Sequence, residues 1–408
     1  MEIFEVGGAV RDALLGRPVK ERDWVVVGAT SDELEKLGYR RVGKDFPVFL
    51  HPQTGEEYAL ARTETKVAPG YHGFDVDATP AVSLEEDLGR RDLTINAMAR
   101  DSSGRIIDPY GGQRDLAAKR LRHVSNAFCE DPLRVLRVAR FLARFHELGF
   151  TVADETISLM RTVVDAGELG ALRPERVWRE TEQALREPSP QQYFETLRAC
   201  GALAVVFPEI EALFGVPQSP RWHPEIDTGV HTLMALRVAA SLSPDPAVRF
   251  AVLIHDLGKA ATSAALLPAH RGHEQRSVEI IENLCKRLPV PRRYRELALC
   301  VARYHGIIHR AAELRASTLF KVIEATDAIR RPERLEAVLT ACEADARGRK
   351  GLEARPYPQR ERLLAALAAA AATSSQDLDP ELTGAALGEA LRQRRIAAIR
   401  AALAPAGE

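Results

Sequence analysis

The feature that most constrains the fold is a change of hydrophobic periodicity at Asp131-Pro132. Before it, short β-branched runs alternate with helical stretches, and Gly and Pro interrupt them throughout. After it, apolar residues recur with the helical period of 3.6 residues. The chain is therefore predicted to have an α+β N-terminal part followed by a part that is nearly all helix.

The pattern also predicts individual elements. Strands are predicted at residues 2–6, 23–27, 48–51, 58–62 and 106–108. Residues 63–83 are predicted to form a long mobile loop. Pro217-Gln218-Ser219-Pro220 is predicted to be a domain junction. Residues 363–373 and 385–402 are predicted to be helices, the second one basic and amphipathic.

Two short motifs lie close together near the N-terminus. Gly7-Gly8-Ala9-Val10-Arg11 follows the first predicted strand, and Glu21-Arg22-Asp23 opens the second. Glycine lets the backbone approach a ligand, and a helix N-terminus with Arg11 in its first turn suits an anion. On a strand Glu21 and Asp23 would face the same side, where a hard cation such as Mg²⁺ would stabilise the pair. An exposed edge strand with two solvated acids is the alternative.

An arginine-bearing helix is predicted to follow the change of periodicity. Asp131 is expected as its N-cap and Pro132 as its first residue. Four arginines recur every three or four residues and form a stripe with almost no acids to neutralise it: Arg134, Arg137, Arg140 and Arg144. This surface suits a triphosphate or an RNA backbone, and a solvated basic face is the alternative. Arg90-Arg91-Asp92 adds a second basic corner, in which Asp92 either caps a helix or braces an arginine.

The order of these motifs resembles that of one enzyme family. Gly-Gly-Ala-Val-Arg-Asp, Glu-x-Asp-Trp, Arg-Arg-Asp-Leu-Thr-Ile-Asn-Ala and Glu-Asp-Pro-Leu-Arg follow each other within residues 1–220. They resemble the motifs of bacterial CCA-adding enzymes, the tRNA nucleotidyltransferases of the class that includes bacterial poly(A) polymerases. The resemblance implies a DNA polymerase beta-like nucleotidyltransferase head, a helical neck and body, and a tail. The usual metal motif begins with Asp or Glu, so Glu21 is a tolerated variant.

The resemblance also implies roles for single residues. Glu21 and Asp23 would be catalytic and bind Mg²⁺. The nucleotide would be bound by Gly8, Arg11, Arg91, Asp131, Arg134, Arg137 and Arg140. Asp131 and Arg134 would read the base, because Asp accepts hydrogen bonds, Arg donates them, and cytosine and adenine both place an amine beside an unprotonated ring nitrogen. Glu57 is a candidate third carboxylate, for which surface charge is the alternative.

A second motif, Ile254-His255-Asp256-Leu257-Gly258, lies in the C-terminal half, where seven of the eleven histidines fall within residues 223–309. Such a cluster favours a metal site. This half resembles the HD family of metal-dependent phosphohydrolases. The matching positions are His231, His255, Asp256 and Asp345, with His273 and His305 as ligands of a second metal. Imidazole and carboxylate ligands suit Ni²⁺, Mn²⁺ or another transition metal better than Mg²⁺.

Four domains are expected: a nucleotidyltransferase head (1–125), a helical neck and body with the base-reading helix (126–220), an HD domain (221–355) and a helical tail (356–408). The expected function is template-independent addition and repair of the 3′-terminal CCA of tRNA from CTP and ATP. The HD half would add phosphatase, 2′-nucleotidase or 2′,3′-cyclic phosphodiesterase activity, unless that fold is purely structural. The alternatives are a poly(A) polymerase, a CC-only or A-only enzyme, and a phosphohydrolase whose head merely binds RNA.

Composition limits the possible binding partners and the cellular compartment of the protein. A formal net charge of −1 argues against indiscriminate coating of nucleic acid. Five cysteines without paired spacing indicate a reducing compartment, so a cytoplasmic protein is expected. No segment is apolar for long enough to span a bilayer, and no membrane partner is expected. Assembly into a homo-oligomer stays open.

Overall fold

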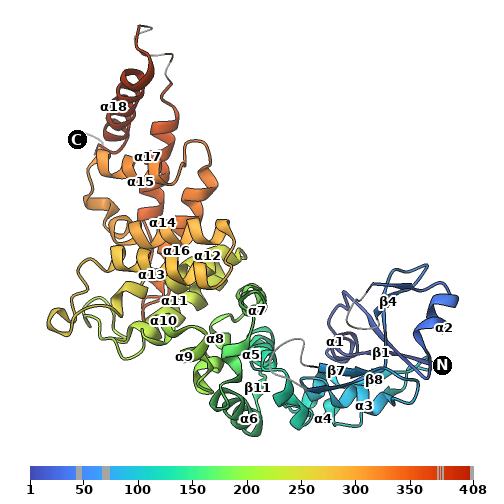
Figure 1. The fold of residues 1–408 in the computed structure, drawn as a ribbon. Coiled ribbons are helices and arrows are strands. Elements are labelled where there is room, and N and C mark those ends of the chain that lie inside the picture. Colours follow the sequence, from blue (N-terminus) through green and yellow to red (C-terminus); the bar gives the residue numbers. More distant parts are fainter. Residues whose placement is uncertain (43–47, 67–73, 375, 377, 379–380, 405–408) are drawn as a thin grey trace. The chain divides into compact units, whose positions relative to one another are not determined.

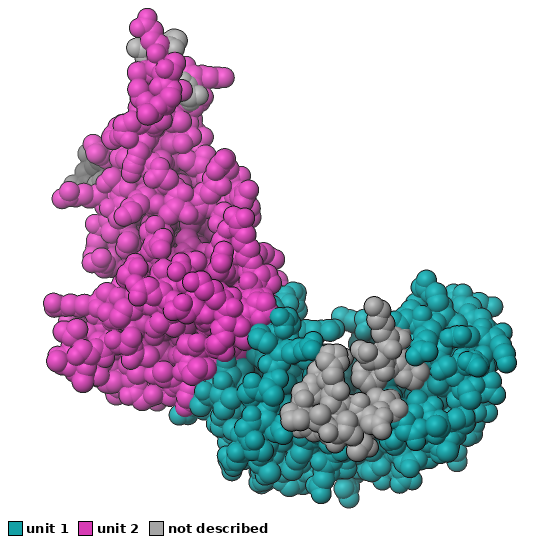
Figure 2. Space-filling view, viewed as in Figure 1, with its two compact units in different colours: residues 1–206 teal, residues 207–408 magenta. Residues whose placement is uncertain are grey.

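The computed structural model describes residues 1–42, 48–66, 74–374, 376, 378 and 381–404. These residues form two compact units, residues 1–206 and 207–408 (Figure 2). The first unit begins with a sheet and helices and continues with helices, whereas the described part of the second contains helices without a strand. This confirms the predicted α+β part followed by an all-α part. Gln218 is buried inside the second unit, so the boundary lies before the predicted junction at residues 217–220.

A seven-stranded sheet organises the start of the first unit, which is drawn in blue in Figure 1. Its strand order is β3-β4-β5-β2-β1-β8-β9. Its strands are β1 (Glu2–Val6), β2 (Asp23–Val27), β3 (Arg40–Arg41), β4 (Val48–Leu50), β5 (Glu57–Leu60), β8 (Ala99–Arg100) and β9 (Ile106–Ile107). Strand β2 is central, because it pairs antiparallel with β1 and parallel with β5. The predicted bounds of β1 and β2 are confirmed. The two-residue strands β3 and β8 were not predicted, because they are too short to show an alternating pattern.

The prediction of a mobile loop at residues 63–83 is wrong for two segments. Strands β6 (Thr63–Lys66) and β7 (Phe74–Asp77) pair antiparallel with each other. Thr-Glu-Thr-Lys and Phe-Asp-Val-Asp both alternate β-branched or aromatic residues with charged ones, which is a strand pattern. Residues 67–73 lie outside the described residues.

Helices cover both faces of the sheet. Its helices are α1 (Gly8–Leu14), α2 (Ser31–Lys36), α3 (Leu84–Gly89) and α4 (Gly112–Ala117). Val25 packs in one core cluster with Leu88 of α3, and Val26 packs in another with Leu34 of α2. Because strand side chains alternate, Asp23 shares the face of Val25 and lies on the side of α3.

The rest of the first unit is a helical layer. It contains α5 (Leu133–Phe145), α6 (Asp154–Asp165), α7 (Pro174–Arg186), α8 (Gln191–Ala199) and α9 (Ala202–Val206), with the short parallel pair β10 (Arg120–Leu121) and β11 (Thr151–Val152). Helix α5 packs against α7 and α8. It begins one residue later than predicted, at Leu133, and the carboxylate of Asp131 accepts the N–H of Leu133 at 3.1 Å. Asp131 therefore still supports the start of the helix.

The second unit is built around one buried helix. Its helices are α10 (Pro208–Glu211), α11 (Thr228–Leu242), α12 (Pro246–Ile254), α13 (His273–Arg287), α14 (Arg292–His309), α15 (Ala316–Ala325), α16 (Pro332–Arg347), α17 (Gln359–Ala371) and α18 (Gly384–Ala402). Every residue of α12 is buried, and α11, α14 and α16 surround it. His255 and Asp256 follow its last residue and so enter the interior. Helices α17 and α18 confirm the predicted helices at 363–373 and 385–402. Among the described residues, no helix is both long and apolar enough to cross a membrane.

Candidate active sites

A cavity of about 680 Å³ in the first unit brings together the residues predicted to bind nucleotide and Mg²⁺. All nine line it: Gly8, Arg11, Glu21, Asp23, Arg91, Asp131, Arg134, Arg137 and Arg140. Arg62, Asn96 and Arg176 also line it and were not predicted. The motifs of β1–α1, β2, the end of α3 and the start of α5 therefore meet at one place.

Two carboxylates lie at one side of this cavity. Asp23 is the first residue of β2, but Glu21 lies before the strand, so the prediction that both are strand residues is wrong for Glu21. Burial raises the pKa of Asp23; the positive charge of Arg91 opposes this, and the negative charge of Glu21 adds to it. Two repelling acids at a polar cavity fit a divalent cation with a preference for oxygen ligands. Glu57 is in register with Asp23 on β5, but it is exposed and is not part of the cavity lining.

The glycine turn is pressed against two arginines. Gly7 has a φ of 70°, and a Cβ atom there would lie 2.8 Å from Nη1 of Arg91. A Cβ atom on Gly8 would lie 3.4 Å from Nη2 of Arg11. Arg11 is only 3% exposed, donates to Asp12 and Asn96, and has the Phe145 ring centroid 5.1 Å from its guanidinium carbon. The turn therefore places backbone directly beside fixed positive charge.

The arginine stripe of α5 is neutralised by acids from other segments. Arg137 Nη2 lies 2.7 Å from Asp92, Arg140 Nε lies 2.6 Å from Glu180, and Arg144 Nη2 lies 3.1 Å from Asp12. The expectation of a stripe with almost no neutralising acids is therefore wrong for the folded chain, because the partners come from elements distant in sequence. Asp92 braces an arginine, as one of its two predicted roles required. Burial alone would raise the pKa of Asp92, but the charge of Arg137 and hydrogen bonds from Asn96 and Arg137 hold that pKa well below its usual range.

The two residues predicted to read the base already form hydrogen bonds with other residues of the protein. Asp131 accepts the Leu133 N–H with Oδ1, and Arg176 donates to its Oδ2 at 3.0 Å. Arg134 is buried and donates to the carbonyl oxygens of Ala127 at 2.7 Å and Arg90 at 2.5 Å. Arg176 lies on α7, 45 residues from Asp131, and no sequence signal connects the two.

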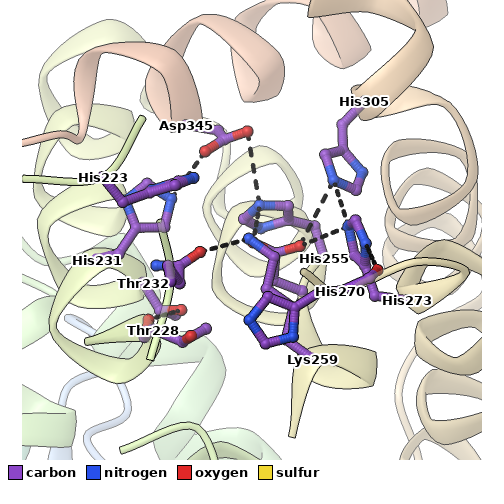
Figure 3. A network of polar contacts seen from close by, with 12 residues as sticks. His223, Thr228, His231, Thr232, His255, Lys259, His270, His273, His305 and Asp345 are labelled. Carbon is purple, nitrogen blue, oxygen red and sulfur yellow. Dashed lines mark hydrogen bonds and ion pairs between the residues drawn. The ribbon is translucent and has the colours of Figure 1, made fainter. Parts of the chain in front are cut away.

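A second site occupies the interior of the second unit, where histidines and acids from α11, α13, α14 and α16 and from the end of α12 converge (Figure 3). Nε2 of His231 lies 2.8 Å from Oδ1 of Asp345, and Nε2 of His255 lies 3.7 Å from Oδ2 of Asp345. Nε2 of His273 lies 3.2 Å from Oδ1 of Asp256. Three groups of three could each hold a metal ion, with ligand atoms within 4.8 Å of one another. They are His223, Glu225 and His231; His231, His255 and Asp256; and Asp256, His273 and His305. The cluster thus contains all six predicted ligands.

The hydrogen bonds of the histidines fit metal binding. Nδ1 of His255 donates to Val252 at 2.7 Å, Nδ1 of His273 donates to His270 at 2.8 Å, and Nδ1 of His305 faces the carbonyl oxygens of Val301 and Ala302, both at 3.1 Å. Backbone carbonyls thereby fix the tautomer and leave each Nε2 as a ligand. Nε2 of His255 and Oδ1 of Asp256 are buried without a hydrogen-bond partner. Burying such polar atoms without a partner costs free energy unless a metal ion binds them. This set of donor atoms therefore fits a transition metal.

Four side chains around this cluster were not predicted as part of it. Oε1 of Glu225 lies 3.0 Å from Nδ1 of both His223 and His231. Nζ of Lys259 lies 2.6 Å from Asp256. Nε2 of His309 lies 2.6 Å from Asp345. Burial alone would raise the pKa of Asp256, but the charges of His255 and Lys259 hold it well below its usual range. His223 and His309 belonged to the histidine-rich stretch, whereas nothing in the sequence pairs Glu225 with His231.

Comparison with known proteins gives three matching families. Residues 3–122 match the Poly A polymerase head domain, residues 149–214 match the probable RNA and SrmB-binding site of polymerase A, and residues 228–367 match the HD domain. A solved CCA-adding enzyme in apo form II has a TM-score of 0.67 at 20% identity, covering 97% of this chain and 88% of that chain. The Thermotoga maritima CCA-adding enzyme complexed with tRNA has a TM-score of 0.64 at 20% identity, covering 100% and 88%.

Curated relatives are much more similar in sequence. The multifunctional CCA protein of Thioalkalivibrio sulfidiphilus is 64% identical over 98% of both chains. That of Nitrosococcus oceani is 61% identical over 99% of both chains. Because relatives at this identity span almost the whole length, the chain belongs to the family of multifunctional CCA proteins.

Proposed function

We propose that this protein adds and repairs the 3′-terminal CCA of tRNA, using CTP and ATP without a nucleic-acid template. The observation that carries the proposal is the cavity that gathers the acid pair, the glycine turn and the arginines of α5. The names of the relatives support it, and solved structures with this fold include CCA-adding enzymes with ATP, with CTP and with tRNA. In this proposal, residues 1–220 carry out the nucleotidyl transfer and residues 221–355 form the metal-dependent phosphohydrolase domain. Residues 356–408 form a helical tail.

The proposed chemistry assigns a role to each side of the cavity. The Gly7-Gly8 backbone, Arg11 and Arg91 would bind the triphosphate, because fixed donors and positive charge suit phosphate oxygens. Glu21 and Asp23 would hold Mg²⁺, which would lower the pKa of the tRNA 3′-hydroxyl and stabilise the leaving pyrophosphate. The 3′-oxygen attacks the α-phosphorus, and the bond from that phosphorus to the pyrophosphate oxygen breaks.

Base selection is proposed for Asp131 and Arg134. An amine of cytosine or adenine would donate to Asp131, and the adjacent ring nitrogen would accept from Arg134. The base must then be bound while Asp131 keeps its hydrogen bonds from Leu133 and Arg176, and while Arg134 keeps its hydrogen bonds to the carbonyl oxygens of Ala127 and Arg90. These bonds would hold both side chains in one orientation, so guanine and uracil, with the opposite pattern, are rejected at the cost of mismatched buried groups.

Substitution of Asp23 tests the proposal. Asp23→Ala is expected to lower CTP incorporation into tRNA lacking its CCA end by more than about 100-fold, since even partners of a metal ligand typically contribute 10- to 100-fold. Glu35→Ala, which removes an exposed acid from α2, is the control and is expected to leave the rate unchanged. If Asp23→Ala retains incorporation, the assignment fails. Sequencing the 3′ ends made with CTP alone, with ATP alone and with both nucleotides together separates CCA addition from poly(A), CC-only and A-only synthesis.

A second proposed function is hydrolysis of phosphate esters at RNA ends by the cluster in the second unit, with Ni²⁺ or Mn²⁺ bound. The observation that favours it is the set of Nε2 and carboxylate atoms held toward one another by backbone-anchored rings. Asp256→Ala is expected to abolish metal-dependent hydrolysis of nucleoside 2′-phosphates and 2′,3′-cyclic phosphates while CCA addition persists. Hydrolysis at the wild-type rate in this variant would refute the assignment of the site.

A further inference from the structure

A second cavity of about 360 Å³ lies beside the histidine cluster of the second unit. It shares His223, Lys259 and His273 with the surroundings of that cluster. Its volume is within the range of small-ligand pockets. A molecule in this cavity would therefore lie directly next to the atoms proposed to hold the metal.

An exposed indole lines this cavity. Trp222 is 54% exposed, and it is the only aromatic residue among the exposed large hydrophobic residues of the described chain. The guanidinium carbon of Arg221 lies 4.9 Å from the centroid of its ring. An arginine over the indole orients the ring, and the exposed part of its surface is available to a flat partner. Stacking of a base on such a ring is a common way of binding single-stranded nucleic acid.

Two donors without partners lie in the same lining. Gln218 is 2% exposed, and its Oε1 accepts from Lys259 at 2.6 Å, whereas its Nε2 has no hydrogen-bond partner. Nε of Arg349 is also buried without a partner, and its guanidinium approaches Asp345 only to 4.0 Å. A buried donor left unpaired is costly, so both positions fit a ligand that brings acceptor oxygens.

The charge of the lining points the same way. Lys259, Arg271 and Arg349 face this cavity together with a single acid, Glu274. Lysine and arginine donors suit phosphate oxygens. A stacking face, cationic donors and an adjacent metal cluster together match one chemical class, a nucleotide whose phosphate is to be cleaved.

We infer that this cavity binds the terminal nucleotide of the RNA end, with its base stacked on Trp222 and its phosphate directed to Arg349 and Gln218. The inference rests on the proposed phosphohydrolase function and adds to it that the site selects nucleotides rather than phosphate esters in general. Trp222 is thus a specificity-determining residue, not a metal ligand.

Steady-state kinetics of full-length Trp222→Ala and Trp222→Phe test this, with a nucleoside 2′-phosphate and the base-free glycerol 2-phosphate as substrates. Trp222→Ala is expected to raise KM for the nucleotide by about 5- to 150-fold, the equivalent of the 1–3 kcal/mol of a base–aromatic stack. Its kcat is expected to change little, and glycerol 2-phosphate kinetics should match wild type. Trp222→Phe keeps an aromatic face and is expected to stay near wild type. An equal effect of Trp222→Ala on both substrates, or on neither, overturns the inference.

A binding measurement separates this inference from the proposed hydrolysis. The chain has three tryptophans, so the fluorescence of Trp222 is obtained as the difference between wild type and Trp222→Phe. Saturable quenching of that difference by a nucleoside 2′-phosphate is expected whether or not the wild type hydrolyses it. If the nucleotide quenches this fluorescence but is not hydrolysed with Ni²⁺ or Mn²⁺, only the proposed hydrolytic function is refuted. Absence of quenching refutes the base-binding role, and Trp222 would then be an ordinary exposed side chain.

Discussion

At the scale of single residues, Asp92 connects two segments of the first unit that are far apart in sequence. Its Oδ1 accepts from the Leu93 N–H and from Asn96, and its Oδ2 accepts from Arg137 of α5 at 2.8 Å. The carboxylate is buried, whereas the side chain of Arg137 is partly exposed. The pair therefore holds one arginine of the stripe in place at the edge of the cavity.

Asp92→Asn is expected to destabilise this region by about 2 kcal/mol, less than the 3–5 kcal/mol of a fully buried pair because Arg137 is in contact with solvent. The folded pKa of Asp92 is lowered, so its contribution is fully present above the unfolded pKa of about 3.9 and is lost as the pH falls through the lower folded pKa. The difference between wild type and variant should thus be largest at neutral pH and shrink below about pH 4.

Hydrogen exchange of the α5 amides, measured between pH 3 and pH 7, checks this. Asp165→Asn, at the exposed end of α6, is the control and should match wild type at every pH. A difference between wild type and Asp92→Asn that grows as the pH falls would contradict the proposed linkage.

The contacts of these residues also show what sequence alone can establish. Gly8, Asp23 and Arg134 each belong to a short motif at the end of a strand or helix, and such ends meet at one edge of the fold, so a shared cavity could be expected. The partners of Arg140 and Asp131 could not, because Glu180 and Arg176 both come from α7, 40 and 45 residues along the chain from the residues that they contact. Periodicity predicts the face of a helix, but not which distant acid will neutralise it.

At the scale of elements, two glycines set how closely helices approach in the second unit. A Cβ atom on Gly258 would overlap the carbonyl oxygen of His273 and lie 2.5 Å from the backbone nitrogen of Ser277. A Cβ atom on Gly348 would overlap the backbone of Ala235 on α11. The first contact fixes the start of α13, which carries His273, against the segment of Asp256. The second holds the end of α16, which carries Asp345, against the helix of His231. The sequence places Gly258 two residues after Asp256, but which helix packs against it depends on tertiary structure.

Gly258→Ala is expected to weaken metal binding by about 10- to 100-fold, because α13 must shift and His273 moves away from Asp256. Gly388→Ala in α18 is the matched control, since its Cβ atom would meet nothing within 4 Å. That change should be neutral or stabilise by up to about 1 kcal/mol. Titration of metal-free protein with Ni²⁺ measures the affinity, and circular dichroism checks the fold. A wild-type affinity for the Gly258→Ala protein would show that this close approach does not position the ligands.

At the scale of the whole molecule, two compact units carry donor sets of different chemistry. The first offers Glu21 and Asp23, which are oxygen ligands. The second offers imidazole nitrogens together with carboxylates, and the histidines predicted as its ligands are His231, His255, His273 and His305. Oxygen ligands suit Mg²⁺, and imidazole suits transition metals, so the two proposed activities should respond to different ions.

Chelation followed by addition of single ions is expected to separate the two activities. Mg²⁺ alone should restore nucleotide incorporation into truncated tRNA but not hydrolysis of nucleoside 2′-phosphates, because it coordinates imidazole poorly and dehydrates reluctantly. Ni²⁺ or Mn²⁺ added afterwards should restore hydrolysis. Asp256→Ala protein treated identically is the control: its incorporation should recover with Mg²⁺, and its hydrolysis should not recover with any ion. Recovery of hydrolysis with Mg²⁺ alone would contradict the assignment of the histidine cluster to a transition metal. Mg²⁺ would then be active at a site built largely from imidazole nitrogens, although it prefers oxygen ligands.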